Sequence, residues 1–218
     1  MKNPEVFVGI PSGTEWKADF GMSLAGLVAS AARPLKNGGR VNRLQLWNTK
    51  GSILPRSRDT LARKAIELEC SHLLFLDSDM TFPNWTLHQL LSHGKQVVAA
   101  NCATKMIPAT PTARQFEEGN RAGSMVYTRE QNGLEKVWRV GTGVMLIEVA
   151  VFKGLPTPWF PISWEEDKLD YTGEDWNFCQ VLQDKGIPIF IDHTLSRSIG
   201  HLGQYEYTHA EVGGQEEG

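Results

Sequence analysis

The chain has 218 residues, of which 41% are hydrophobic and 22% charged, and its formal net charge is −3 at pH 7. Length and composition indicate one soluble globular domain, and the slightly negative charge argues against a general nucleic-acid-binding protein. The three cysteines form no C-x-x-C pair, which argues against a disulfide framework and a zinc site. No stretch is apolar enough to span a membrane and the N-terminus lacks a signal-peptide core, so we expect a cytoplasmic protein.

Apolar runs and helical patterns alternate along the first half of the chain. The apolar runs predict strands at residues 6–10, 41–47, 72–76, 96–100, 144–147 and 187–191. Helical patterns cover residues 20–32, 57–69 (with Ser57 or Asp59 as the cap) and 83–92. This order predicts an α/β fold with a mostly parallel central sheet flanked by helices.

The second half is less regular and more antiparallel in character. Residues 124–128 and 136–140 are predicted to form a hairpin through the turn at 131–133, which contains Asn-Gly. A helix is predicted to begin directly after Thr172, which would be its N-cap residue. Residues 206–218 are acidic and glycine-rich, and we expect this tail to fray.

Two aspartates follow the predicted strand at residues 72–76. Asp77 and Asp79 are separated by Ser78, and ligand sites in open α/β sheets lie beyond the carboxyl ends of strands. In an extended conformation residues i and i+2 point the same way, so both carboxylates would face one crevice. Two carboxylates held this close favour a divalent cation between them, although a turn cap at Asp79 beside a solvated Asp77 is the simpler alternative.

This D-x-D run resembles that of GT-A glycosyltransferases of the family-2 type, especially small bacterial and phage-borne members. Four other segments match those of the family in order and approximate spacing. One precedes the D-x-D run, at residues 58–65, and three follow it, at residues 141–147, 173–178 and 192–203. The resemblance covers residues 5–203.

The resemblance implies a single GT-A catalytic domain over residues 1–205. Residues 1–105 would form the half that binds the nucleotide sugar, and residues 106–205 the smaller, more antiparallel acceptor half. Residues 206–218 would lie outside this domain as the tail.

The same resemblance assigns donor and metal ligands. Nucleotide-sugar contacts are expected from Pro11, Ser12, Gly13, Arg58, Arg63, Asp77, Ser78 and Lys105. For Arg58, Arg63 and Lys105, a solvated surface position is an equal alternative. A cation, Mn²⁺ or Mg²⁺, is expected on Asp77, Asp79 and His201, and His193 competes for the last position because it directly follows the strand at 187–191.

On the acceptor side, the resemblance implies contacts from Gly141, Thr142, Gly143 and Trp164. A plain turn at the glycines and a buried hydrophobic plug around Trp164 are the structural alternatives. Asp175 is assigned as the general base that deprotonates the acceptor hydroxyl, with Glu174 as second choice. Both carboxylates would lie in a first helical turn, where they also suit the helix dipole.

The sequence therefore predicts a metal-dependent glycosyltransferase, inverting in stereochemistry, with a UDP-sugar as the expected donor. The acceptor hydroxyl is left open between a glycan, a protein and, for a phage enzyme in the host cytoplasm, a hydroxymethylated DNA base. Nine basic residues against one acid between positions 33 and 64 favour the last only weakly. A nucleotidyltransferase and a non-catalytic nucleotide-sugar or glycan-binding module are the alternatives. Oligomeric state is not predicted.

Overall fold

The computed structural model describes residues 3–35, 38–167, 169–203, 206–210 and 212. Its helices are α1 (Ala18–Ala31), α2 (Leu54–Glu67), α3 (Thr86–Ser92), α4 (Val149–Lys153), α5 (Glu174–Asp184) and α6 (His193–Ser196). The strands of its largest sheet are β1 (Glu5–Ser12), β2 (Arg43–Lys50), β3 (His72–Leu76), β5 (Val97–Ala99), β8 (Leu134–Val137), β9 (Val144–Glu148) and β12 (Ile189–Asp192). The shorter strands are β4 (Met80–Thr81), β6 (Arg114–Glu117), β7 (Asn120–Met125), β10 (Ser163–Glu165), β11 (Asp170–Thr172), β13 (Gly200–Leu202) and β14 (Glu206–Tyr207).

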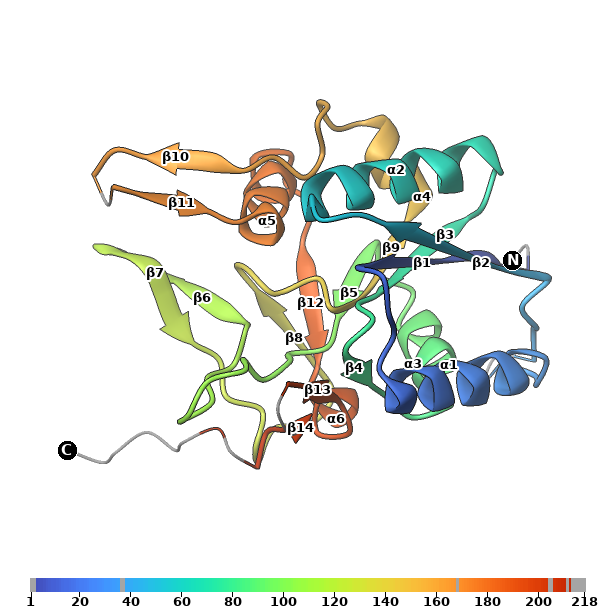
Figure 1. Ribbon diagram of the computed structural model, residues 1–218. Coiled ribbons are helices and arrows are strands. Elements are labelled where there is room, and N and C mark those ends of the chain that lie inside the picture. The colour runs from blue at the N-terminus through green and yellow to red at the C-terminus, as the bar shows by residue number, and fades with distance from the viewer. Residues whose placement is uncertain (1–2, 36–37, 168, 204–205, 211, 213–218) are drawn as a thin grey trace.

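A mixed seven-stranded sheet in the order β2-β1-β3-β9-β5-β12-β8 forms the centre of the molecule (Figure 1). Strands β2, β1, β3, β5 and β12 run in one direction, whereas β9 and β8 run against them. The prediction of an α/β fold with a mostly parallel central sheet and flanking helices is confirmed. Both halves of the chain contribute strands to this one sheet, because β9 lies between β3 and β5.

Alternate residues of the strands pack into two separate hydrophobic cores. On the face covered by α2, α4 and α5, Phe7 and Phe75 pack against helix residues that include Leu61 and Phe178. On the face covered by α1 and α3, the intervening strand residues form the second core with Phe20, Leu24 and Leu90. This two-sided burial explains why the strands read as continuous apolar runs in the sequence. The three cysteines are buried, as predicted.

Helix α2 begins three residues earlier than predicted. Leu54 is its first residue and Pro55 lies in its first turn, where proline needs no hydrogen-bond donor. No side chain caps it, so the prediction of Ser57 or Asp59 as the cap is wrong. Because the helix begins at Leu54, Arg58 lies inside it, where its side chain is buried. Helix α3 also differs, because it begins at Thr86 and not at Pro83.

The predicted hairpin between residues 124–128 and 136–140 is wrong. Strand β7 pairs with β6, through a turn at Gly119, whose φ of +80° is the left-handed conformation that glycine adopts without strain. Strand β8 instead joins the edge of the large sheet, antiparallel to β12. The Asn-Gly turn at 132–133 ends next to α6, since Gly133 O accepts from His193 N at 2.9 Å.

The predicted tail is ordered over part of its length. Strand β14 pairs with β13, and Tyr207 and Val212 are buried in a small cluster with Ala103 and Ala109. The prediction that fraying starts at residue 206 is therefore wrong, while residues 213–218 lie outside the described part. Within the described ranges, no helix combines the length and apolarity that a membrane span requires.

Candidate active site at the carboxyl edge of the sheet

The D-x-D segment leaves β3 as a tight turn. Asp77 N donates to Gly143 O at 2.9 Å, and Met80 N donates back to Asp77 O at 3.1 Å. The segment is thus a turn and not extended as expected, although Asp77 and Asp79 both line one cavity. Asp77 makes an ion pair with Arg58, whereas Asp79 pairs with Lys105 and faces His201.

A small cavity of about 180 Å³ brings the first loop and the D-x-D turn together. It is lined by Pro11, Ser12, Gly13, Gly51, Leu54, Asp77, Ser78 and Asp79. The juxtaposition of residues 11–13 with residues 77–79, which the sequence predicted, is confirmed. Asn48 fixes this loop, because its side-chain amide donates to Ser12 Oγ at 2.7 Å and to Ile10 O at 2.8 Å. Asn48 lies on β2, beyond the predicted strand at residues 41–47, and this role was not predicted from the sequence.

A second hollow of about 390 Å³ adjoins this cavity and shares Gly51 with it. Lys50 and Arg56 line it, together with the hydroxyl-bearing residues Ser52 and Thr60. Leu54, the first residue of α2, lines the cavity, so the start of this helix lies beside both spaces. A helix N-terminus with cations and hydroxyls nearby favours an anion such as a diphosphate.

Asp79 and His201 form a pair that suits a metal. His201 Nε2 lies 3.6 Å from Asp79 Oδ1, and His201 Nδ1 lies 2.8 Å from Ala103 O. A carbonyl oxygen only accepts hydrogen bonds, so Nδ1 carries a proton and Nε2 is the ring nitrogen that faces Asp79. One carboxylate and one imidazole nitrogen are ligands that Mn²⁺ and Mg²⁺ sites use. Among the described residues, no three His, Cys, Asp or Glu side chains gather closely enough to complete a site from protein alone.

The charge around Asp79 is already arranged for a cation. Burial opposes ionisation of this carboxyl, but hydrogen bonds and positive charge from His201 and Lys105 outweigh it and lower its pKa to about 2. Asp79 is therefore ionised across the physiological range. Lys105, predicted to contact the donor, instead makes a short ion pair with Asp79.

Arg58 joins the D-x-D turn to the first turn of α5. Its side chain is 2% exposed, and it lies 3.0 Å from the Asp77 carboxylate and 3.3 Å from that of Glu174. The guanidinium also lies over the ring of Phe75, 5.4 Å from its centre. Its Nη1 has no hydrogen-bond partner among the described residues. Arg58 thus bridges two carboxylates, a role that differs from the predicted phosphate contact.

Glu174 and Asp175 lie in the first turn of α5, as predicted, but Gly173 and not Thr172 is the N-cap residue. Asp175 Oδ1 accepts from Trp176 N at 2.7 Å. Burial, followed by the negative charge of Glu174, raises the pKa of Asp175 to about 6. A carboxylate with a pKa near 6 is mostly ionised at pH 7 and is a stronger proton acceptor than an ordinary aspartate, as a general base requires.

The raised pKa of Asp175 predicts how the free energy of unfolding changes with pH. A carboxyl whose pKa is raised by folding destabilises the native state when it ionises, so stability falls as pH rises from about 4 through 6. Asp175→Asn removes that charge and should raise the free energy of unfolding by about 2–3 kcal/mol at pH 8. At pH 4 most of this gain should vanish. Urea denaturation of both proteins at the two pH values checks this, and an equal gain at pH 4 and pH 8 contradicts it.

Of the three predicted residues 141–143, Gly143 lies beside the D-x-D turn. Gly143 packs so closely that a Cβ there would meet Met80 Sδ at 3.3 Å and Asp77 Oδ2 at 3.6 Å. Gly141 packs against Thr112, and the hydroxyl of Thr142 is buried without a partner among the described residues. Gly143 therefore permits the approach of the β9 backbone to Asp77.

The structure does not bring two other predicted residues to this site. Arg63 lies over the ring of Trp159, 5.7 Å from its centre, and borders a hollow on the outer side of α2. It lies five residues beyond Arg58, which turns it to a different face of the helix. Trp164 lies on β10 and packs edge to face with Tyr171, whereas Trp159 and Phe160 form the buried plug.

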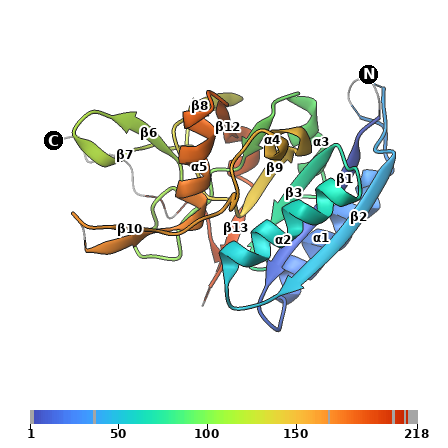
Figure 2. The same cartoon turned by 90° about the horizontal axis from the view of Figure 1, so that it is seen from above.

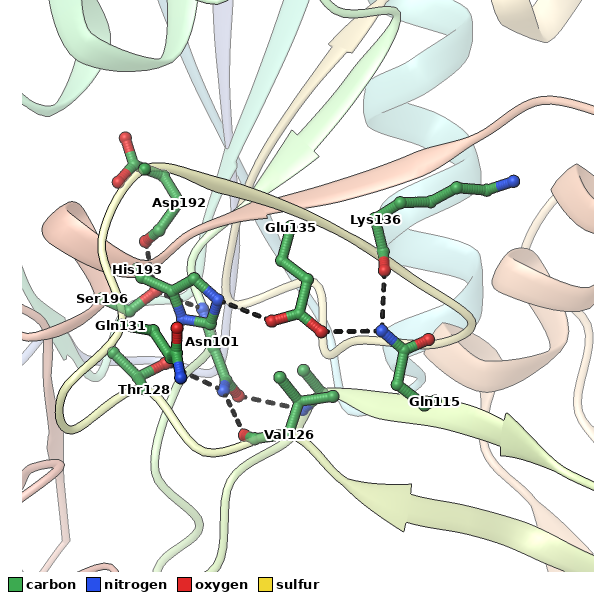
Figure 3. Close-up of polar contacts among 12 residues, drawn as sticks. Asn101, Gln115, Val126, Thr128, Gln131, Glu135, Lys136, Asp192, His193 and Ser196 are labelled. Carbon is green, nitrogen blue, oxygen red and sulfur yellow. Dashed lines mark hydrogen bonds and ion pairs between the residues drawn. The ribbon is translucent and has the colours of Figure 1, made fainter.

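His193 belongs to a separate buried network at the end of β12 (Figure 3). Its Nε2 lies 2.8 Å from Glu135 Oε2 and its Nδ1 lies 3.1 Å from Thr128 Oγ1. Asn101 Nδ2 donates to the same hydroxyl at 3.1 Å. With both ring nitrogens engaged and only 2% of the residue exposed, His193 is structural, and His201 remains the metal ligand candidate.

Comparison with known proteins shows the fold and leaves the family open. No family model matches the chain, and no curated protein matches it. Among solved structures, the chain is similar to A197 from STIV, with a TM-score of 0.57 and 15% sequence identity over 91% of this chain and 86% of that one. A similarity at this level supports a shared α/β fold.

Proposed function

We propose that the protein is a metal-dependent glycosyltransferase of the GT-A fold. The observation that carries this proposal is the link through Arg58. On one side of it lies the D-x-D turn beside the first-loop cavity, and on the other lies Asp175, whose pKa of about 6 suits a general base. A binding cavity for a nucleotide and a proton acceptor are thus held at fixed positions by one buried side chain.

In this proposal the nucleoside diphosphate of the donor lies in the cavity of Pro11, Ser12 and Gly13, at the start of α2. Asp79 and His201 would hold Mn²⁺ or Mg²⁺ next to the diphosphate. The cation would supply positive charge to the leaving group. The ion pair of Asp79 with the Lys105 ammonium supports this assignment, because it marks the position where positive charge is stabilised.

Asp175 accepts the proton of the acceptor hydroxyl as its oxygen bonds to the anomeric carbon of the sugar. The bond from that carbon to the diphosphate breaks, and its electron pair leaves with the nucleoside diphosphate. Attack from the face opposite the leaving group inverts the anomeric configuration. The pairing of Glu174 with Arg58 supports Asp175 over Glu174 in this role.

Metal-dependent nucleotide binding tests the proposal. UDP should bind more tightly by tenfold or more with Mn²⁺ than in EDTA, and Asp79→Ala should abolish that difference. Asp184→Ala is the matched control, because Asp184 is an exposed aspartate at the end of α5, away from the cavity residues. Calorimetry with UDP, and with ADP and GDP as further probes, measures both effects. Equal nucleotide affinity in Mn²⁺ and EDTA, or an Asp79→Ala protein that still responds to Mn²⁺, would sink the proposal.

A further inference from the structure

Two hairpins, β6–β7 and β10–β11, project side by side from the molecule near α5 (Figures 1 and 2). An ion pair between Arg121 and Asp167 connects them. Between them lies a hollow of about 400 Å³, whose walls include Phe116, Glu117, Glu118, Trp138, Arg139 and Glu165. We refer to this hollow as the hairpin groove.

A ladder of flat side chains runs along the hairpin groove toward Asp175. Phe116 packs edge to face on Trp138, with 5.5 Å between ring centres. The Arg139 guanidinium lies 3.7 Å from the centre of the Trp138 ring and 5.1 Å from that of Trp176. Trp176 directly follows Asp175, and Arg139 is close enough to Asp175 for the two charges to interact. The groove therefore leads to the carboxylate that the proposed function makes the base.

Phe116 stands at the outer end of this ladder. It is 67% exposed, and its ring packs on Trp138 at the wall of the hairpin groove. The remaining wall is polar and includes Glu117, Glu118 and Glu165 together with Asn120 and Arg121. Apolar ring faces combined with carboxylate acceptors match a sugar chain, which presents C–H faces and hydroxyl donors.

The charge of the two hairpins bears on which acceptor fits. Residues 163–172 contain four acids and one lysine, so their formal charge is −3, and residues 114–125 contain two arginines and two acids, which cancel. Glu174 and Asp175 add further negative charge at the inner end. Among the residues that line the groove, the three carboxylates outnumber Arg121 and Arg139. This excess of negative charge disfavours a nucleic-acid backbone but not an uncharged glycan. The basic residues between positions 33 and 64 do not line the hairpin groove.

We infer that the hairpin groove binds an uncharged oligosaccharide, and that this is the acceptor of the proposed transfer. Only the role of this oligosaccharide as the acceptor rests on the proposed function. Oligosaccharide binding itself stands on the ring ladder, the carboxylates and the charge. A modified DNA base as acceptor is the alternative that it excludes.

Binding to defined oligosaccharides tests the inference. Maltohexaose, cellohexaose, chitohexaose and mannohexaose serve as uncharged probes, and single-stranded dT12 as the polyanion, each followed by saturation-transfer NMR and titration. At least one hexasaccharide should bind, and Phe116→Ala should weaken that binding about fivefold to tenfold, as expected for loss of one ring contact. Tyr171→Ala is the matched control. Tyr171 is 66% exposed, but it pairs with Trp164 on the face of the β10–β11 hairpin opposite Glu165.

Three outcomes overturn the inference. They are no binding of any of the four hexasaccharides, equal weakening by Phe116→Ala and Tyr171→Ala, and binding of dT12 that Phe116→Ala abolishes. Mn²⁺-dependent UDP binding, measured on the same proteins, separates this inference from the proposed function. Phe116→Ala should leave it unchanged. Hexasaccharide binding without metal-dependent UDP binding would support the hairpin groove as an oligosaccharide site and contradict the proposed glycosyltransferase function.

Discussion

In Arg58→Met, the free energy of unfolding at pH 7 should fall by about 3–5 kcal/mol, the range measured when one partner of a buried ion pair is removed. Arg58 is 2% exposed, and the side chains of Asp77 and Glu174 that it joins are 25% and 13% exposed. Methionine fills much of the same volume, so the loss comes mainly from two carboxylates left without their cation.

Urea denaturation of wild type and variant measures this effect. Arg63→Met is the control, because it removes an exposed arginine from the same helix with the same change of side chain. Its stability should change by less than about 1 kcal/mol, as expected for an exposed charge. Adding Asp77→Asn and Glu174→Gln to Arg58→Met should recover part of the lost stability. If Arg58→Met and Arg63→Met unfold at the same urea concentration, Arg58 does not hold the site together.

Arg58 also connects parts of the chain that are far apart in sequence. Asp77 follows β3 in the first half, and Glu174 begins α5 in the second, 116 residues after Arg58. This connection gives a physical reason why the cavity lined by residues 11–13 and the carboxylate pair of α5 keep a fixed relation.

Much of the central sheet could be predicted because its strands are buried on both faces. β1, β3 and β9 read as unbroken apolar runs, and the polar residues that end β3 are where the structure places the candidate site. Helix α1 and the start of α5 were also placed to within a few residues. These features follow from local composition, which a single sequence contains.

Features set by distant contacts could not be predicted. The Asn-Gly turn at 132–133 predicted that residues 136–140 would pair with residues 124–128, but β8 pairs instead with the distant strand β12. The burial of Arg58 depends on Asp77 and Glu174, neither of which is its sequence neighbour. The packing of Tyr207 in the predicted tail depends on Ala103 and Ala109. In each case the deciding partner lies far away along the chain.

Asp175 and Glu174 are adjacent carboxylates, and the structure predicts opposite outcomes when each is replaced by its amide. Asp175→Asn keeps the shape and the acceptor for Trp176 N but removes the proton acceptor. Transfer should fall by about 10²-fold or more, as expected for loss of a general base, while stability at pH 8 rises. Glu174→Gln removes a charge from the Arg58 bridge, so stability should fall while most of the transfer activity remains.

Steady-state transfer from a UDP-sugar, with melting temperatures for the same proteins, measures both outcomes. Glu166→Gln is the control, since Glu166 is an exposed carboxylate between β10 and β11, and it should match wild type in both measurements. Loss of activity together with loss of stability in Asp175→Asn would indicate a structural role and contradict the assignment as base. An inactive Glu174→Gln beside an active Asp175→Asn would exchange the two roles. Full activity in both variants would show that neither carboxylate is required by itself, which contradicts the assignment of Asp175 as the base.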